Sequence, residues 1–269
     1  MNQRYKVFDA HTHAFPDAIA RGAVDGLSEK AGIAHFHNGS YDELAQYEAQ
    51  ADGYLLLPIA TKPAQMRSVN TWAAQKMGGK MQAFGSVHPL AEDWRPELDH
   101  VQSLGLKGIK LHPEYQDFYA DDPRHFPLYA EIFARGLILC FHAGVDLGFP
   151  PPLHGAAEAI ARVADAFPNG RIIAAHMGGY QQFDEAMAHL AGRENLWMDT
   201  SYVADEMAKE QLVQLSRAHG IDRILFATDA PWKPFDSMLA AVLNAGFDED
   251  ELQKILYQNA AKLLNLEDA

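Results

Sequence analysis

Histidine and aspartate residues close several short apolar runs of the 269-residue chain. One run leads into the pair His11 and His13, two later runs end at His142 and His176, and the run RILFAT ends at Asp229. Imidazole nitrogens and carboxylate oxygens are the ligands that Zn²⁺ and related divalent ions bind. If the runs are parallel strands of one barrel, their carboxyl ends meet and these side chains converge. The pattern therefore predicts a divalent-metal site.

Such a ligand set predicts catalysis rather than a structural metal. Three or four protein ligands leave a coordination position for water, which is typical of catalytic sites. Water held by a divalent ion can lose a proton near neutral pH and become a nucleophile. Asp229 could both contact the ion and accept that proton, and His176 is a second candidate for moving protons.

Eight short apolar runs with β-prone composition predict the strands that position these side chains. They are Tyr5–Phe8, Tyr54–Ile59, Gln82–Val87, Leu106–Leu111, Leu137–Phe141, Ile172–Ala175, Leu196–Met198 and Ile224–Ala227. Helical patterns alternate with them at Ala64–Met77, Pro96–Leu104, Pro127–Ala134, Ala156–Ala166, Phe183–Ala191 and Glu206–His219. Strands that alternate with helices indicate βαβ units and a parallel sheet.

Eight such units predict closure into a (β/α)8 TIM barrel of the α/β class. A doubly wound open sheet is the competing fold, but it favours a glycine-rich first turn, and here the first turn reads HTHAF. Two extra C-terminal helices are expected at Phe235–Ala245 and Glu249–Leu264. No linker or low-complexity segment divides the chain, so we expect one domain over residues 1–269.

Alternation of side chains along each strand predicts which residues face the barrel interior. His142 is expected on the same side of its strand as Cys140, and Asp229 on the same side as Ala227. On the same argument Asp9 faces inward with His11 and His13, and Lys110 faces inward between apolar neighbours. We expect Asp9 to orient a ligand histidine, and Lys110 to bind a substrate carboxylate or to pair with Asp9.

Further residues are expected around the pocket. His112 follows the fourth strand and is a candidate for substrate contact, as is Trp232 after the eighth. Two long connections, His112–Phe126 and Gly144–His154, leave the carboxyl ends of strands, where barrel active sites are built, and are expected to wall the pocket. Six further histidines are expected on the surface: His35, His37, His100, His125, His189 and His219. Cys140 is expected in the core.

Composition limits the partners and the compartment. The net charge of −14 argues against nucleic acid or an anionic membrane as a partner, and a small-molecule substrate is expected. No run approaches the roughly 18 apolar residues of a membrane span, and the N-terminus lacks a signal-peptide core. A single cysteine fits a reducing cytoplasm. A homo-oligomer is left open.

The motifs jointly resemble the amidohydrolase superfamily. The resemblance runs from residue 5 to about residue 266 and is closest to the amidohydrolase-related branch, which contains TIM-barrel hydrolases and decarboxylases. It is carried by DAHTH at Asp9–His13, GIKLHP at Gly108–Pro113, His142, AHMGG at Ala175–Gly179, TDAPW at Thr228–Trp232 and QNAAKLL at Gln258–Leu264.

The resemblance implies a role for each member of the ring. His11, His13, His142 and Asp229 would ligate one metal ion, usually zinc. His176 would activate water or bind a second ion. Lys110 matches the position that carries a metal-bridging carbamate in some members, so a second ion held by His176 and Lys110 is the alternative to a single one.

The sequence leaves three functions open. The first is a metal-dependent hydrolase that acts on a small carboxylated or cyclic ester, lactone or amide. The second is a metal-dependent nonoxidative decarboxylase of a small aromatic or muconate-like carboxylic acid, which would use the same ligands. The third is a barrel that has lost catalysis and only binds a ligand. Hydrolysis is favoured because the chain lacks the extra length associated with the decarboxylases, which is an argument by analogy of fold.

Overall fold

The computed structural model describes residues 5–266 of the chain. Over these residues eight strands run parallel to their neighbours. They are β1 (Phe8–Thr12), β2 (Gly53–Leu56), β3 (Met81–Ala83), β4 (Gly108–Leu111), β5 (Ile138–Phe141), β6 (Ile172–Ala174), β7 (Leu196–Asp199) and β8 (Ile224–Leu225).

The strands form two ladders whose edges meet at two seams. One ladder contains β1 to β3 and the other β4 to β8. At the first seam Gly85 N donates to Gly108 O and Lys110 N donates to Gly85 O, both at 2.8 Å. At the second seam Ala10 N donates to Phe226 O, and Asp229 N donates to His11 O, both at 2.9 Å. Backbone hydrogen bonds therefore run around the whole ring, as the predicted TIM barrel requires.

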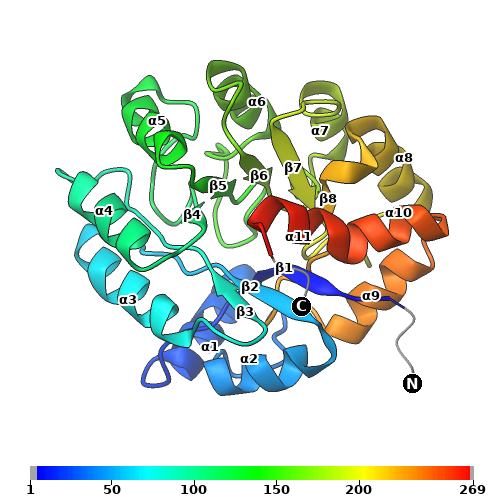
Figure 1. Ribbon diagram of the computed structural model, residues 1–269, viewed down its shortest axis with the longest axis horizontal. Coiled ribbons are helices and arrows are strands. Elements are labelled where there is room, and N and C mark those ends of the chain that lie inside the picture. Colours follow the sequence, from blue (N-terminus) through cyan, green and yellow to red (C-terminus); the bar gives the residue numbers. More distant parts are fainter. Residues whose placement is uncertain (1–4, 267–269) are drawn as a thin grey trace.

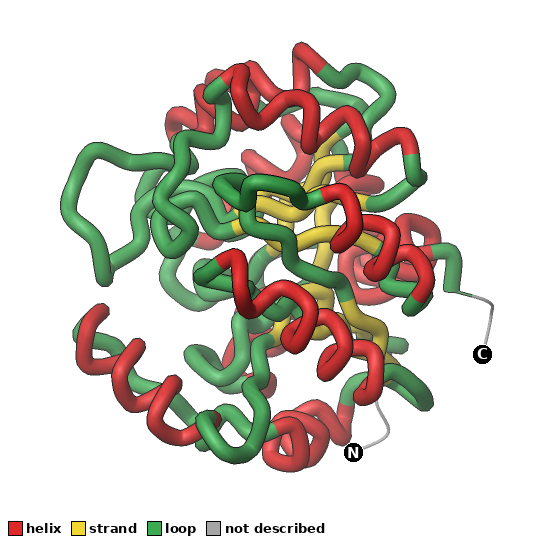
Figure 2. The backbone as a smooth tube through the Cα atoms, turned by 90° about the vertical axis from the view of Figure 1, so that its left-hand side faces the viewer, coloured by secondary structure: helices red, strands yellow, loops and turns green. Residues whose placement is uncertain are grey.

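Helices surround the ring of strands (Figure 1). They are α1 (Ala20–Ala31), α2 (Tyr41–Tyr47), α3 (Met66–Lys76), α4 (Arg95–Ser103), α5 (Phe126–Ala134), α6 (Ala157–Ala166), α7 (Phe183–His189), α8 (Lys209–His219), α9 (Phe235–Leu243), α10 (Glu249–Gln253) and α11 (Asn259–Leu264). Short 3-10 turns occupy Glu48–Gln50, Pro63–Gln65, Pro123–His125 and Ile221–Arg223. Long loops collect on the left-hand side of Figure 2, while the yellow strands lie in the middle.

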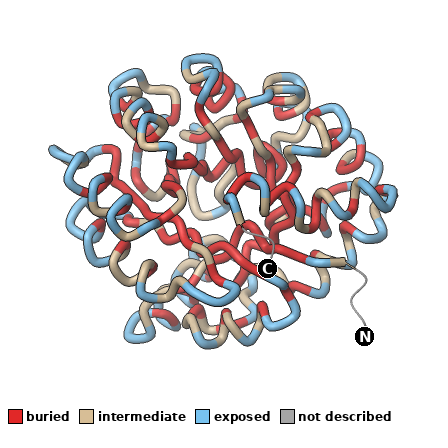
Figure 3. Tube along the Cα trace, in the orientation of Figure 1, coloured by how far each residue is buried: buried red, intermediate tan, exposed pale blue. Residues whose placement is uncertain are grey.

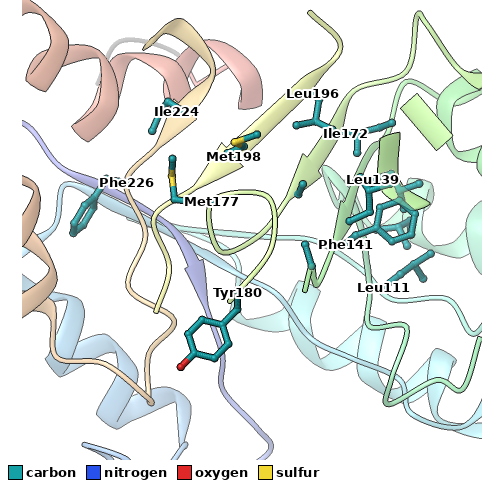
Figure 4. Packing of buried hydrophobic residues seen from close by; sticks show 14 of the residues in the cluster. Leu111, Leu139, Phe141, Ile172, Met177, Tyr180, Leu196, Met198, Ile224 and Phe226 are labelled. Atoms are coloured by element: carbon teal, nitrogen blue, oxygen red, sulfur yellow. The ribbon is translucent and has the colours of Figure 1, made fainter. Parts of the chain in front are cut away.

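Two apolar layers hold the barrel together, and burial is concentrated on the strands (Figure 3). The outer layer lies between strands and helices and includes Leu111, Leu139 and Phe141, which lie together in Figure 4. The inner layer fills the barrel and contains Phe8, Ala10, Leu55, Leu57, Phe84, Ile138, Cys140, Ile173, Leu225 and Ala227. Alternate residues of one strand thus enter different layers, as strand geometry dictates.

The C-terminal segment closes one end of the barrel. Ala260, Leu263 and Leu264 of α11 pack into the inner layer, and α11 lies in front of the strands in Figure 1. The predicted helix Glu249–Leu264 is interrupted by a π-helical segment, Lys254–Gln258. Cys140 is buried in the inner layer as expected. No helix within residues 5–266 is long and apolar enough to cross a membrane.

Two expectations about elements and burial are wrong, and two helices were not predicted. The first strand covers Phe8–Thr12 instead of Tyr5–Phe8, because parallel pairing with β2 begins at Phe8 opposite Gly53. The segment between the first two strands contains α1 and α2, which the apolar pattern did not reveal. Three histidines expected on the surface are buried: His37, His125 and His219. His219 is fully buried. Its ring tolerates burial because both nitrogens lie within hydrogen-bond distance of backbone carbonyls, those of Leu190 and Leu196.

Candidate metal centre

Three potential ligand atoms meet where β1 and β8 adjoin. His11 Nε2 lies 3.2 Å from His13 Nε2. Asp229 Oδ1 lies 3.4 Å from the first nitrogen and 3.3 Å from the second. His11 and Asp229 are buried, and His13 is partly buried. The three residues form a group that could hold a metal ion.

Hydrogen bonds on the far side of each imidazole leave a lone pair on each of these nitrogens, and His11 Nε2 also lies 3.3 Å from Lys110 Nζ. His11 Nδ1 lies 2.9 Å from Asp199 Oδ2, and His13 Nδ1 lies 2.8 Å from Leu57 O. Each acceptor lacks a proton, so in both rings Nδ1–H is the donor and Nε2 carries a lone pair. A partner on the distal nitrogen is the usual support of a metal-binding histidine.

The donor set fits a divalent cation. Two imidazole lone pairs and a carboxylate oxygen attract a cation and, without one, leave acceptor atoms facing one another. In a tetrahedral site with metal–ligand bonds near 2.0–2.2 Å, neighbouring ligand atoms are about 3.4 Å apart. The observed separations of 3.2 to 3.4 Å match that spacing.

His176 extends this group toward His142. The ring of His176 lies beside that of His11, with 5.4 Å between the ring centres. His176 Nδ1 lies 3.0 Å from Ser201 O, so that nitrogen donates and Nε2 accepts. His176 Nε2 lies 3.0 Å from His142 Nδ1, which therefore donates to it. His142 Nε2 is left buried without a hydrogen-bond partner among the described residues.

The contact between these two histidines depends on Gly144. Its backbone has φ +84°, and a Cβ at this position would lie 2.3 Å from Tyr180 N. Only glycine therefore lets the loop after β5 lie against the loop after β6. His176 (φ +58°) and Asp229 (φ +70°) also have left-handed backbones, which are rare outside glycine and concentrate at functional sites.

The structure places His142 in a second potential ligand group. His142 stacks on His112, with ring centres 4.1 Å apart, and His112 Nε2 lies 3.3 Å from Asp146 Oδ2. His112, His142 and Asp146 satisfy the distance requirement for a metal group, whereas His142 is absent from the group of His11, His13 and Asp229. The assignment of His142 as a fourth ligand stays a prediction.

Burial favours the charge states that metal binding needs. Burial and the Lys110 ammonium hold the pKa of His11 well below its usual value. Burial also lowers the pKa of His112 and of His142, so all three rings are neutral at pH 7. Burial raises the pKa of Asp229, but the nearby imidazoles lower it more, and the net pKa lies below the ordinary value. Neutral imidazoles and an ionised carboxylate are the ligating forms.

Asp199, which sequence reasoning missed, organises the centre. Its carboxylate lies next to His11 Nδ1 and accepts from the backbone N–H groups of His176 (3.0 Å) and Ser201 (3.1 Å). The Ser201 hydroxyl also donates to it. A signal was available, because Asp199 closes the apolar end of the seventh run (LWMD) as Asp229 closes the eighth.

The predicted inward direction of Asp9 is wrong. Asp9 Oδ1 accepts from Thr228 N and His11 N at 3.0 Å, and Thr228 Oγ1 donates to Asp9 Oδ2 at 2.5 Å. Phe8 and Ala10 enter the barrel interior instead, and the register of β1 shifts between Asp9 and Thr12, so Asp9 and His11 do not share a face. Asp9 therefore fixes the backbone of His11 and leaves its imidazole to Asp199.

Lys110 lies inside the barrel next to the centre. Its side chain is buried, with Nζ 3.3 Å from His11 Nε2 and 3.8 Å from Cys140 Sγ. The expected pairing with Asp9 is not observed, since the Asp9 oxygens are bonded to Thr228 and His11. Burial raises the pKa of Cys140 to about 12, so this residue is a neutral thiol.

A cavity of about 660 Å³ opens onto these residues. Lys110, His112 and Trp232, the three predicted substrate contacts, line it together with His11, His13, His142, His176 and Asp229. Both long loops contribute to its wall, with Tyr115 from the first and Val145 to Leu147 from the second. The cavity therefore joins the potential metal ligands to a space that accepts a small molecule.

Comparison with known sequences decides the family. The Amidohydrolase family profile matches residues 8–266. The chain belongs to the amidohydrolase family. The match covers all eight strands and confirms the resemblance drawn from the motifs, and it agrees with an enzyme rather than a barrel that only binds a ligand. Among curated proteins none matches this chain.

Solved structures resemble this amidohydrolase over nearly its whole length. A 5-carboxyvanillate decarboxylase from Sphingomonas paucimobilis is 19% identical, with a TM-score of 0.74 over 98% of this chain and 100% of that one. A dihydroxybenzoic acid decarboxylase from Polaromonas sp. JS666, with bound manganese, is 16% identical, with a TM-score of 0.73 over 98% of each chain. A proposed 2-pyrone-4,6-dicarboxylic acid hydrolase from Pseudomonas putida is 17% identical, with a TM-score of 0.69 over 99% of this chain and 100% of that one.

Proposed function

We propose that this amidohydrolase is a metal-dependent decarboxylase that releases CO₂ from a small aromatic or muconate-like carboxylic acid. The observation that carries the proposal is the position of Lys110. Its ammonium lies beside the potential metal ligands at one end of a cavity whose other walls are mainly apolar. A single carboxylate bound at that end meets both Lys110 and the ion.

The charge of the cavity lining supports one carboxylate per substrate and so favours the aromatic acid over a muconate-like diacid. Lys110 is the sole lysine or arginine that lines the cavity within residues 5–266. Lys110 offers up to three donors to carboxylate oxygens, and its burial keeps the interaction from being screened by water. Away from Lys110 and the ion, a second carboxylate would meet no lysine or arginine of the lining and would be costly to bury.

The apolar walls favour loss of CO₂. Decarboxylation converts a charged carboxylate into neutral CO₂, and apolar surroundings disfavour the charged starting form. Leu57, Ile59 and Tyr202 are among the side chains that exclude water around the substrate. The charged residues of the lining are limited to Lys110, Asp146 and Asp229.

The proton is moved by groups already in place. His11, His13 and Asp229 would hold the ion, with His142 as the predicted fourth ligand, and the ion would supply positive charge that binds and polarises the substrate. Asp229 is ionised and can accept a proton from a substrate hydroxyl and return it to carbon. The C–C bond breaks, its electron pair stays on the ring carbon, that carbon takes the proton, and CO₂ leaves.

The structural neighbours support decarboxylation as the preferred reaction. Two of the three described above are decarboxylases, although at 16 and 19% identity the likeness extends to the fold alone. One of them carries manganese. We therefore propose that the native ion is manganese or zinc.

We also propose a cytoplasmic location, which the single buried cysteine supports.

Hydrolysis of a lactone or ester is the second candidate. It is favoured by the lowered pKa of Asp229, because an ionised carboxylate beside a bound water can act as a general base. The hydrolase from Pseudomonas putida has the same fold. Both reactions use the same residues, so only the products distinguish them.

A product analysis tests the proposal. Protein loaded with manganese or zinc is given hydroxybenzoic acids labelled with ¹³C at the carboxyl group and, in parallel, aryl esters and lactones. We expect labelled CO₂ from at least one ortho-hydroxybenzoic acid and no acid release from the lactones. Lactone opening without any CO₂ release would reject decarboxylation and establish the second candidate.

A further inference from the structure

We propose that an apolar part of the cavity, called here the chamber, binds an uncharged hydrophobic tail of the substrate. The inference rests on the proposed function in one respect: the reacting head lies at the Lys110 end. The chamber lies between α1, α3 and the end of β2. Its walls are Ala23, Gly26, Leu27, Ile33, Ile59, Val69 and Trp72.

The volume of the cavity exceeds the needs of a small aromatic acid. A cavity of about 150 Å³ is enough to hold a benzene ring. The cavity measures about 660 Å³, roughly four times that size. A benzoic acid held at Lys110 would leave most of the space filled with water against apolar walls, which is unfavourable. A substrate with a larger apolar part removes that contact.

The faces of α1 show that the chamber is built to face a ligand. Ala20 and Val24 are buried on one side of the helix, and Arg21, Asp25 and Glu29 are exposed on another. The third side, with Ala23 and Leu27 one turn apart, lines the cavity and is only partly buried. Apolar side chains on a half-buried helix face gain stability when an apolar ligand covers them.

Exposed apolar side chains also lie at the mouth of the cavity. Ile19 just before α1 and Leu147 in the loop after β5 both line the cavity, and they are 56% and 41% exposed. Few large apolar side chains of the described residues are this exposed. Two of them at one cavity mouth indicate an apolar ligand rather than scattered surface residues.

None of the charged residues that line the cavity comes from α1 or α3. The charged lining residues are Lys110, Asp146 and Asp229, which belong to the loops and strands around the potential metal ligands. Gln65, Ser68 and Thr61, near α3, are polar but neutral. A charged tail would find no partner in the chamber, so the tail is uncharged.

Aromatic contacts hold α1 against the rest of the cavity wall. Lys30 Nζ of α1 lies 3.3 Å from the ring centre of Phe149 and 5.0 Å from that of Tyr115. These two rings come from the two long loops and contact each other edge to face, with centres 4.8 Å apart. Cation–π contacts thus tie α1 to both loops, and the chamber is part of the folded molecule.

The substrate class follows from these observations. It is a carboxylic acid with one carboxylate on its reacting head and an uncharged apolar substituent, either an alkyl chain or a second aryl ring. Acids with a second charged group are excluded by the lining, and unsubstituted acids bind only through their head.

A homologous series of ligands tests the chamber by binding alone. Protein loaded with manganese is titrated calorimetrically with benzoate and with 4-alkylbenzoates from methyl to octyl. Each added methylene buried in the chamber is expected to lower Kd about two- to fourfold until the tail fills it. A Kd that does not change from methyl to octyl would overturn the proposal.

Two glycines of α1 supply a matched pair of variants. Gly26 lines the cavity and Gly22 does not, while a Cβ at either position would meet no atom within 4 Å. Both changes to leucine raise helix propensity by a similar amount. Gly26→Leu is expected to weaken binding of 4-octylbenzoate at least tenfold and to change that of benzoate less than twofold. Gly22→Leu is expected to change neither, and equal effects of the two variants would overturn the proposal.

The binding titrations separate this inference from the proposed reaction. They need no turnover, so binding that depends on tail length in a protein that releases no CO₂ would reject the reaction and keep the chamber. Release of CO₂ from hydroxybenzoic acids, with a Kd that ignores tail length, would keep the reaction and reject the chamber.

Discussion

Asp229→Asn is expected to lower the rate of substrate turnover by about 10³-fold or more while leaving the fold intact. The change removes a charged ligand atom from the group of His11 and His13 and removes the group that accepts and returns the proton. Loss of a positioned acid or base alone typically costs 10²–10⁴-fold. The amide is nearly the same size as the carboxylate, so the buried site keeps its packing. Steady-state turnover and bound metal per chain, measured together, check the prediction.

A matched control separates the loss of charge at the centre from loss of charge elsewhere. Asp184→Asn makes the same chemical change on the exposed surface of α7 and should leave both turnover and metal content unchanged. If Asp229→Asn kept more than a tenth of the parent turnover with full metal content, Asp229 would be neither a ligand nor the proton carrier.

Asp199→Asn is expected to weaken metal binding 10- to 100-fold, although Asp199 is not in the potential ligand group. The carboxylate accepts from His11 Nδ1 and so leaves the lone pair on Nε2. An amide in its place can donate to Nδ1, which would favour the tautomer whose proton sits on the ligating nitrogen. Removing such a supporting carboxylate typically costs this much affinity or activity.

The dependence of turnover on metal concentration shows whether Asp199 acts by positioning His11. Turnover of Asp199→Asn should be largely restored at high manganese concentration, whereas that of Asp229→Asn should not. The melting temperature of the metal-free protein is compared as well, because Asp199 also accepts from the backbone of His176 and Ser201. Unchanged metal affinity with reduced stability would show that Asp199 serves the fold alone.

The barrel and most of its ring of polar residues could be predicted from the sequence. Apolar runs of strand length, helical patterns between them and the same polar residue types at their ends are local signals, and parallel strands bring those ends together. His11, His13 and Asp229 are brought together for that reason. Alternation also placed Lys110 correctly, because β4 pairs with β5 in regular register.

The failures lie where local pattern and tertiary structure disagree. Asp9 faces away from the barrel interior while the register of β1 shifts between Asp9 and Thr12, and no residue type in DAHTH announces a shifted register. Helix α1 has two glycines and no side-chain cap at its N-terminus, so its sequence lacks the usual signals of a helix. That helix forms one wall of the proposed chamber, so the substrate class was beyond the reach of the sequence pattern.

The position of His142 could not be derived from strand parity. Parity correctly places it on the inner side of β5, but its ring then stacks on His112 and contacts His176. Which of its nitrogens approaches which neighbour depends on loops after three different strands. Two potential ligand groups therefore lie side by side, linked through His142 and His176.

Anomalous scattering from crystals grown with manganese tests the central claim most directly, because it reports which group holds the ion. The predicted result is a manganese peak coordinated by His11 Nε2, His13 Nε2 and Asp229 Oδ1. A peak coordinated by His112, His142 and Asp146, with none at the first group, would contradict the assignment of the metal centre.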